Sequence, residues 1–323
     1  MIDNQEKYSL NEPHQQNALA GLLLSAVTFN DEGNITVKCF IPSENYIQLK
    51  KLPVNWGKLS QHIITLRWKD RELLSMLCKR LGFYLYRSGK EAGCDLSVFK
   101  DVNESLIFWK RYFDSKVYNM AFQTEEPVVP YILRHTQLTP RQVIELCNTI
   151  VENSESFPNS LITGDKIREG VEKCEKKLCR EVFSSFQESY PFSEDFCTQY
   201  LRRLTMSFRI SMLRSVHSVI DDIDGKYLTY KNNYLFLERM IFDLGVIGVG
   251  LPQGTLPVSN IYQLYHLAEF EPNCDGDFNP NDHTDLFVHP MFIHRINFIR
   301  DRNACSKPVC PLQAVETPEI LCL

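Results

Sequence analysis

Two arginines, Arg134 and Arg141, flank a helix start and are the residues whose positions most clearly suggest chemistry. Thr139 supplies a hydroxyl N-cap, Pro140 the first helical residue and Gln142 the third, which together fit a capping box. Arg141 then falls in the first turn, where the positive end of the helix dipole disfavours a cation. A basic side chain in such a place commonly meets an anion. We therefore predict that Arg134 and Arg141 contact a phosphate or an acidic partner. The alternative is a solvated arginine near a helix start.

A second basic feature lies in residues 198–217, which contain four arginines and no acidic residue. The arginines are Arg202, Arg203, Arg209 and Arg214. Apolar periodicity over 194–220 predicts a helix, on which Arg202 and Arg209 share a face because they lie seven residues apart. Such a helix could bind the phosphates of DNA. The alternatives are docking on an acidic protein and a basic face that meets only solvent.

Metal and nuclease chemistry have weaker patterns. Residues 275–281 place Asp and Asn side chains two apart, as at the start of a calcium loop, but Pro280 replaces the turn glycine. The spacing of Cys305 and Cys310 is not the Cys-x2-Cys of zinc sites. Glu175-Lys176-Lys177 fits a nuclease Glu-x-Lys, but it lies on a predicted helix rather than a strand. We expect residues 275–281 to form a solvated loop, Cys305 and Cys310 to be buried thiols, and Glu175-Lys176-Lys177 to lie on a solvated helix face. No metal is expected at any of them.

Charge and cysteine content limit the class of protein. The net charge of −5 over 323 residues argues against electrostatic nucleic-acid binding by the whole chain and leaves room for a local basic patch. Met1–Lys7 lack the basic and apolar regions of a signal peptide, and no apolar run reaches the ~18 residues of a membrane helix. With eleven cysteines, the chain is expected to be cytoplasmic, with reduced thiols and no membrane contact.

Hydrophobic periodicity divides the chain into four regions. Residues 1–68 read as a helix over 13–28 and strands over 35–41 and 63–66, which is part of an α/β domain. The rest is expected to be a helical region at 69–160, for which the resemblance given below implies a lid, a helical and winged-helix-like module at 161–302 and a loose tail at 303–323. The expected helices cover 70–86, 104–113, 140–153, 166–189, 194–220 and 234–244, and strands at 246–249 and 266–270 form a hairpin.

These segments resemble bacterial P-loop ATPases of the STAND and KAP type, relatives of the AAA+ group. The helix start at Thr139-Pro140-Arg141 is similar to their lid-domain helix, and Leu66-Arg67-Trp68 to the link between ATPase core and lid. Residues 242–249, 268–270 and 288–292 resemble their winged-helix module. The resemblance implies an α/β partial P-loop core followed by a mainly α lid region and a winged-helix-like C-terminal module. It also implies ATP and Mg²⁺ as cofactors, with Asp3 in the Mg²⁺-organising position and Arg141 near the nucleotide phosphates.

One motif of these ATPases is missing from the sequence. The phosphate-cradling Gly-x-x-x-x-Gly-Lys-Ser/Thr does not occur, because none of the Gly-Lys pairs at 57, 89 and 225 precedes a serine or threonine. We therefore expect the C-terminal portion of a STAND-like ATPase, a regulatory or interaction module that does not hydrolyse ATP alone. Its expected partner is another protein subunit or a second copy, in bacterial signalling or phage defence. The alternatives are a winged-helix DNA-binding protein and a degenerate nucleotide-sensing scaffold that oligomerises.

Overall fold

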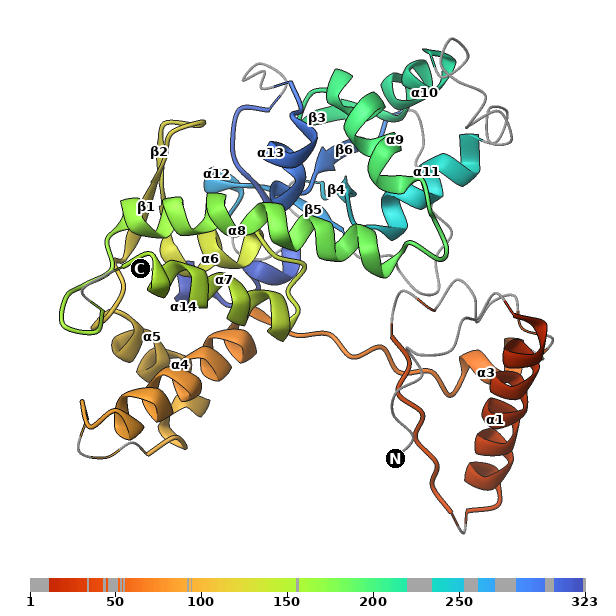
Figure 1. Ribbon diagram of the computed structural model, residues 1–323, viewed down its shortest axis with the longest axis horizontal. Coiled ribbons are helices and arrows are strands. Elements are labelled where there is room, and N and C mark those ends of the chain that lie inside the picture. The colour runs from red at the N-terminus through yellow and green to blue at the C-terminus, as the bar shows by residue number, and fades with distance from the viewer. Residues whose placement is uncertain are drawn as a thin grey trace. The chain divides into compact units, whose positions relative to one another are not determined.

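The computed structural model describes residues 12–33, 35–42, 45, 52, 54, 56–91, 93, 95–154, 157–219, 234–252, 261–270, 283–299 and 305–321. The chain forms two compact units (Figure 1). Unit 1 is centred on the residues up to Arg67, and unit 2 begins at Trp68 and contains most of the remaining chain. Each unit has its own core.

Unit 1 is built on helix α1, Pro13–Asp31, which starts at the residue expected for the helix over 13–28, and on the short helix α3, Trp56–Ser60. Its core contains Ala20, Leu23, Leu52 and Leu59.

The strands expected at 35–41 and 63–66 are wrong for the described residues, where only Cys39 makes an isolated bridge. Asn30 takes the place of a strand partner: its amide nitrogen donates to the Val37 carbonyl at 3.2 Å and its oxygen accepts from the Val37 N–H at 2.8 Å. Residues 63–66 are not assigned to a strand, and the Ile64 side chain is 83% exposed. The P-loop interpretation of this region stays a prediction.

The first part of unit 2 is helical, as expected. The helices are α4 (Asp70–Arg87), η3 (Val98–Lys100), α5 (Val102–Trp109), α6 (Val128–Arg134), α7 (Pro140–Glu152) and α8 (Gly164–Ser185). The helices predicted at 70–86, 104–113, 140–153 and 166–189 are thus confirmed, with small shifts at their ends. An antiparallel hairpin of β1 (Lys116–Asn119) and β2 (Thr124–Pro127), which the sequence pattern did not indicate, precedes α6.

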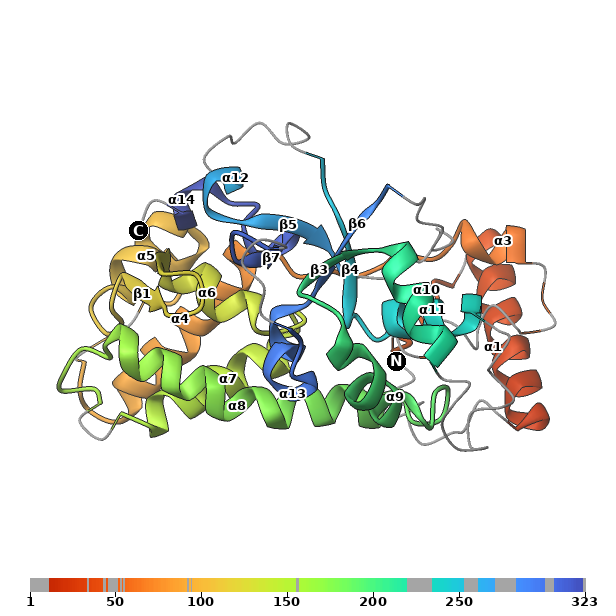
Figure 2. The ribbon, with the colours of Figure 1, turned by 90° about the horizontal axis from the view of Figure 1, so that it is seen from above.

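Close packing of α7 and α8 depends on Gly170. A Cβ at this position would lie 2.7 Å from Cγ1 and 2.8 Å from Cα of Ile150, closer than atoms can approach. Only glycine allows the two helix backbones to come this near. In Figure 2 α8 runs along one side of unit 2, with α6 and α13 (Ile293–Ile296) between it and the strands of the sheet.

The second part of unit 2 contains a mixed five-stranded sheet in the order β3-β6-β4-β5-β7. Its strands are β3 (Ser207–Arg209), β4 (Ile247–Gly250), β5 (His266–Glu269), β6 (Asp285–Val288) and β7 (Val309–Pro311). Strands β4 and β5 pair antiparallel with Val249 opposite Glu269, which confirms the expected pairing. Strand β6 flanks β4 and strand β7 flanks β5, so the β4–β5 pair forms the middle of the sheet. A winged-helix interpretation stays a prediction.

Short helices complete unit 2. They are α9 (Ser193–Tyr200), η4 (Leu201–Arg203), α10 (Ile210–Val219), α11 (Tyr234–Asp243), α12 (Ile261–Leu264), η7 (Pro290–Phe292), η8 (Leu312–Ala314) and α14 (Pro318–Leu321). Helix α11 matches the helix expected at 234–244, and Gly245 follows it with a positive φ of 66° that favours glycine.

Two expectations for this part are wrong. The single helix predicted over 194–220 is broken between α9 and α10, because its middle pairs with distant backbone: Met206 accepts from the Val288 N–H at 2.9 Å and Leu204 from the Ile299 N–H at 3.0 Å. The tail predicted to be loose forms β7, parallel to β5, and α14 over residues 305–321. Cys310 and Ile320 of this segment are fully buried.

Candidate functional site

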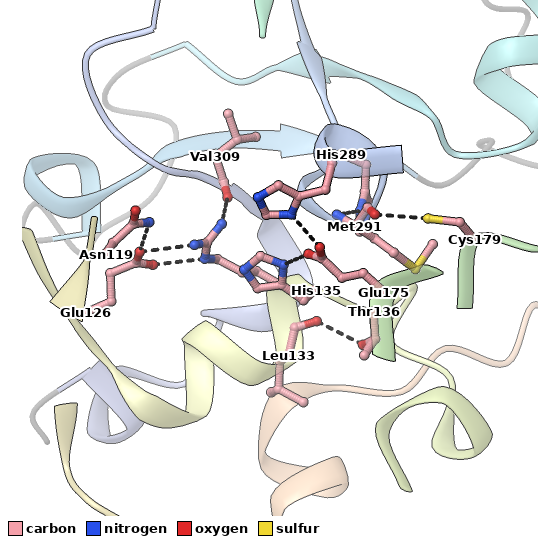
Figure 3. A network of polar contacts seen from close by, with 12 residues as sticks. Asn119, Glu126, Leu133, His135, Thr136, Glu175, Cys179, His289, Met291 and Val309 are labelled. Carbon is pink, nitrogen blue, oxygen red and sulfur yellow. Dashed lines mark hydrogen bonds and ion pairs between the residues drawn. The ribbon is translucent and has the colours of Figure 1, made fainter. Parts of the chain in front are cut away.

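A buried ion pair joins the end of β2 to the end of α6. The side chains of Arg134 and Glu126 are 4% and 1% exposed, and two contacts link them: Nη2 to Oε1 at 3.0 Å and Nε to Oε2 at 2.9 Å. Asn119 on β1 donates to Glu126 Oε1 at 2.6 Å, and Arg134 Nη1 donates to the Val309 carbonyl of β7 at 3.5 Å (Figure 3). Burial by itself would lower the pKa of Arg134, but the Glu126 carboxylate outweighs it and the pKa is raised. The pair is therefore charged.

A second network starts at the next residue, His135, and centres on Glu175 of α8, which is 1% exposed. His135 Nδ1 lies 2.5 Å from Oε1 of Glu175, and His294 Nδ1 on α13 lies 2.6 Å from Oε2. Because a carboxylate only accepts hydrogen bonds, both imidazoles donate from Nδ1. One carboxylate thus holds His135, at the C-terminal end of α6, and His294 of α13, which lie far apart in the sequence.

The protonation states follow from this geometry. Burial raises the pKa of Glu175, but the contacts with His135 and then with His294 outweigh burial and lower it. Burial, and next the positive charge of Arg134, lower the pKa of His135. The buried pair is therefore a carboxylate and a neutral imidazole. Nε2 of His135 is buried and has no hydrogen-bond partner within the residues that the structure describes.

A third histidine, His289, lies before η7 and is 1% exposed. Its Nδ1 accepts from the Met291 N–H at 3.2 Å, and its ring also hydrogen-bonds the backbone of Thr136. Burial comes first, then the positive charge that protonation of His135 would add, then the charge of Arg134; together they lower the pKa of His289 to about 3, so its ring is neutral near pH 7. The Met291 carbonyl accepts from the Cys179 thiol of α8 at 3.0 Å (Figure 3).

The two networks together connect α6 and α8 to β7, η7 and α13, which come from the C-terminal part of the chain. Of the polar side chains around Glu175, His294 is the outer one, with 39% of its side chain exposed. None of the clusters of His, Cys, Asp and Glu among the described residues has the arrangement of a metal site. The two Nδ1 atoms point at the same carboxylate, so this geometry positions helices rather than an ion.

The predicted helix start at Thr139 is confirmed, with one change. Thr139 Oγ1 accepts from the Gln142 N–H at 3.4 Å, but Gln142 Oε1 accepts from the Gln137 N–H at 2.7 Å instead of the Thr139 N–H. Arg141 is exposed and makes no ion pair with the described residues. The guanidinium of Arg134 is already paired with the buried carboxylate of Glu126, so the anionic partner of Arg134 lies inside the fold. The structure therefore does not give the two arginines a shared anion.

The four arginines of 198–217 do not lie on one helix. Arg202 and Arg203 are exposed on η4, and Arg209 is exposed on β3. Arg214, on α10, pairs with Glu238 of α11 at 3.2 Å. Their role in DNA binding stays a prediction. The four arginines lie on η4, β3 and α10 and not on the single helix on which that prediction was based.

Several other candidates can be located only in part. Asp3 and the calcium-like segment 275–281 lie outside the described residues. Cys305 and Cys310 are buried, as expected of structural thiols, and burial raises the pKa of Cys305 to about 11.

The residue that sequence reasoning missed is Glu175, which was assigned to a solvated helix face. It lies instead on the buried face of α8, in register with Ile167, Val171, Leu178 and Val182. The available signal was a carboxylate in an apolar stripe of helical period. Its two histidine partners are 40 residues before it and 119 after it, so no local pattern could reveal them.

One comparison with known proteins gives a match. Residues 71–182, about a third of the chain, match the family described as the FunZ-associated C-terminal helical domain. The matched region runs from α4 to near the end of α8 and contains Glu126, Arg134, His135 and Glu175. No curated protein and no solved structure matches the chain. None of the described helices has the length and apolar character needed to cross a membrane.

Proposed function

We propose that the chain is a regulatory or interaction component that works with a FunZ protein in a bacterial defence-like system. The match over residues 71–182 supports this reading, because that helical domain is described as FunZ-associated.

The observation that carries the proposal is the buried network. Glu126, Arg134, His135 and Glu175 belong to the matched region, whereas Val309 and His294 belong to the C-terminal part of the chain. The ionic groups of the matched region are thus used to fasten its helices to the sheet and to α13. A stiff platform of this kind suits a domain whose task is to present a surface to a partner.

The proposal includes the expected relation to P-loop ATPases. The chain would act beside an ATPase segment and not hydrolyse ATP alone, since it lacks the glycine-rich loop that cradles phosphates. Of the two arginines expected near the nucleotide, Arg141 is the better placed, because it is exposed and has no ion-pair partner in the described part of the chain. A phosphate at Arg134 would have to displace Glu126.

The test is co-expression with the FunZ protein of the same genome. The mass of the purified material, measured by light scattering after size exclusion, should equal that of a complex. Phosphate release from ATP should stay at background for the chain alone. A chain that keeps its own mass in the presence of FunZ overturns the proposed partnership. ATP hydrolysis by the chain alone that disappears in Arg141→Ala overturns the non-hydrolysing reading.

A further inference from the structure

Helix α4 has a face whose cations make no ion pair with the described residues. Residues 73–90 contain the cations Lys79, Arg80, Arg87 and Lys90 and no acidic residue, although the whole chain carries a net charge of −5. Phe83 is 51% exposed, and Tyr84 and Tyr86 are each 53% exposed. Cations and aromatic rings are therefore concentrated on one exposed segment.

Helix geometry places these side chains together. At about 100° per residue, Lys79, Arg80 and Arg87 fall within about 60° of Phe83, and Tyr86 lies beside them. The buried residues Leu74, Leu77, Cys78 and Leu85 occupy the opposite side of α4. The two views place α4 and α5 at one end of unit 2 (Figures 1 and 2). We call Lys79, Arg80, Phe83, Tyr86 and Arg87 the α4 basic-aromatic face.

The charges of this face are not neutralised within the described residues. Lys79, Arg80 and Arg87 form no ion pair there, and Arg87 lies over the Phe83 ring at 5.8 Å from its centroid. Arg87 is in the last turn, where it also offsets the helix dipole, but Lys79 and Arg80 lie too far inside the helix for that role.

The acidic side chains nearby in the sequence are engaged elsewhere. Glu72, one residue before this segment and on the same side of α4, accepts from the Lys69 N–H at 3.0 Å. Glu91 holds Arg111 and Tyr112, Asp95 accepts from the Ser97 N–H, and Asp101 caps α5. The α4 basic-aromatic face therefore attracts anions and offers flat rings beside its cations.

We propose that the α4 basic-aromatic face binds single-stranded nucleic acid. Unpaired bases stack on exposed aromatic rings and on guanidinium planes, while the neighbouring cations neutralise phosphates. An acidic protein surface would also satisfy the cations, but it would not require the planes of Phe83 and Tyr86. Duplex DNA would satisfy the cations and leave the rings without bases to stack on. The proposed site is separate from the arginines of residues 198–217. The inference goes beyond the proposed partnership with FunZ.

The experiment measures the fluorescence anisotropy of a labelled 20-nucleotide oligo(dT) titrated with the full chain, with a duplex of equal length alongside. Tighter binding of the single strand is expected. Phe83→Leu/Tyr86→Leu keeps the apolar surface but removes the rings, and should weaken single-strand binding by about tenfold or more. Arg80→Ala/Arg87→Ala should weaken it and reduce the slope of log K against log salt by about 1.4, for two phosphate contacts.

The matched control is Lys173→Ala/Arg180→Ala, which removes two exposed cations of α8 and should leave affinity unchanged. Thermal melts identify any variant that is unfolded, and Arg80→Lys/Arg87→Lys should retain most of the salt dependence. Absence of binding at 50 mM salt, or equal loss in the control, overturns the proposal. Loss in the arginine variant without loss in the leucine variant also overturns it, because it shows that the strand is held by its phosphates alone and that no base stacks on the rings. Co-purification with FunZ is measured separately, so failure of either inference is recognised on its own.

Discussion

Thr317 fastens the beginning of α4 to the C-terminal segment by two hydrogen bonds to Asp70. Its N–H donates to Asp70 Oδ2 at 2.8 Å and its hydroxyl to Oδ1 at 2.6 Å, across 247 residues of sequence. Asp70 is fully buried, and burial raises its pKa even though the contacts with Thr317 lower it. Helix α4, the first helix of the family-matched region, thus begins at a residue whose carboxyl group accepts two hydrogen bonds from the C-terminal segment.

Thr317→Val should therefore destabilise unit 2. The valine keeps the shape but removes the hydroxyl donor from a buried carboxyl, which costs about 1–3 kcal/mol. The loss should appear as a lower midpoint in urea unfolding followed by circular dichroism. The exposed Thr36 provides the control, since Thr36→Val should shift the midpoint little. An unchanged midpoint for Thr317→Val would mean that the segment around α14 contributes little to the fold.

Breaking the buried ion pair of Arg134 and Glu126 should lower the stability far more than breaking an exposed ion pair of the β1–β2 hairpin. Arg134→Met leaves the Glu126 carboxylate buried without its cation, and the expected loss is about 3–5 kcal/mol. Arg134→Met/Glu126→Leu should recover much of this loss, because no uncompensated charge remains. The exposed pair Lys116–Glu125, at 3.0 Å, is the reference: Lys116→Met should cost at most about 1 kcal/mol. Equal losses for the two single variants would contradict the buried, charged state of Arg134.

Acid should destabilise the fold through His289. Its folded pKa of about 3 is below the usual value of 6.5, so the unfolded chain takes up the proton first. The stability contributed by the neutral ring is complete above pH 6.5 and is lost as pH falls from 6.5 toward 3, by up to about 1.4 kcal/mol per pH unit. His289→Asn keeps an acceptor for the Met291 N–H but cannot titrate, so its stability should vary less with pH in this window. Urea midpoints from pH 7 to pH 4 measure the difference.

The exposed His14 is the matched control for this measurement, since its side chain is 75% exposed. His14→Asn should leave the pH dependence of the midpoint as in the wild type. A slope that is the same for the wild type and His289→Asn would show that the pKa of His289 does not change on folding.

Local signals were sufficient for the helices whose ends are determined by their own residues. Thr139, Pro140 and Gln142 predicted the start of α7 correctly, because an N-cap involves only residues within one turn. The helix predicted over 194–220 was wrong for the opposite reason. Leu204 and Met206 fit a helical period, but their backbone groups pair with Ile299 and Val288, and this pairing overrides local propensity.

The site was hidden for a related reason. Glu175 could have been recognised as buried from the apolar positions around it, but nothing near it in the sequence identifies His135 and His294 as its partners. The tail was expected to be loose on its composition of prolines and cysteines. Those residues instead add a strand parallel to β5, and Arg134 binds the carbonyl of Val309 in that strand. Contacts across such separations depend on the whole fold.

The last prediction separates structure from function at the start of α7. Thr139 caps the helix, so Thr139→Ala should lower the stability by about 1 kcal/mol and leave any anion contact intact. Arg141 is exposed two residues later and makes no ion pair with the described residues, so Arg141→Ala should change the stability by no more than about 0.5 kcal/mol. If Arg141 reaches the phosphates of a nucleotide or an acidic partner, Arg141→Ala should instead weaken that binding. Thermal melts and titrations with ATP and with FunZ, made on both variants, measure the two effects. A large melting loss for Arg141→Ala with unchanged binding would make this arginine structural and remove it from the proposed contact.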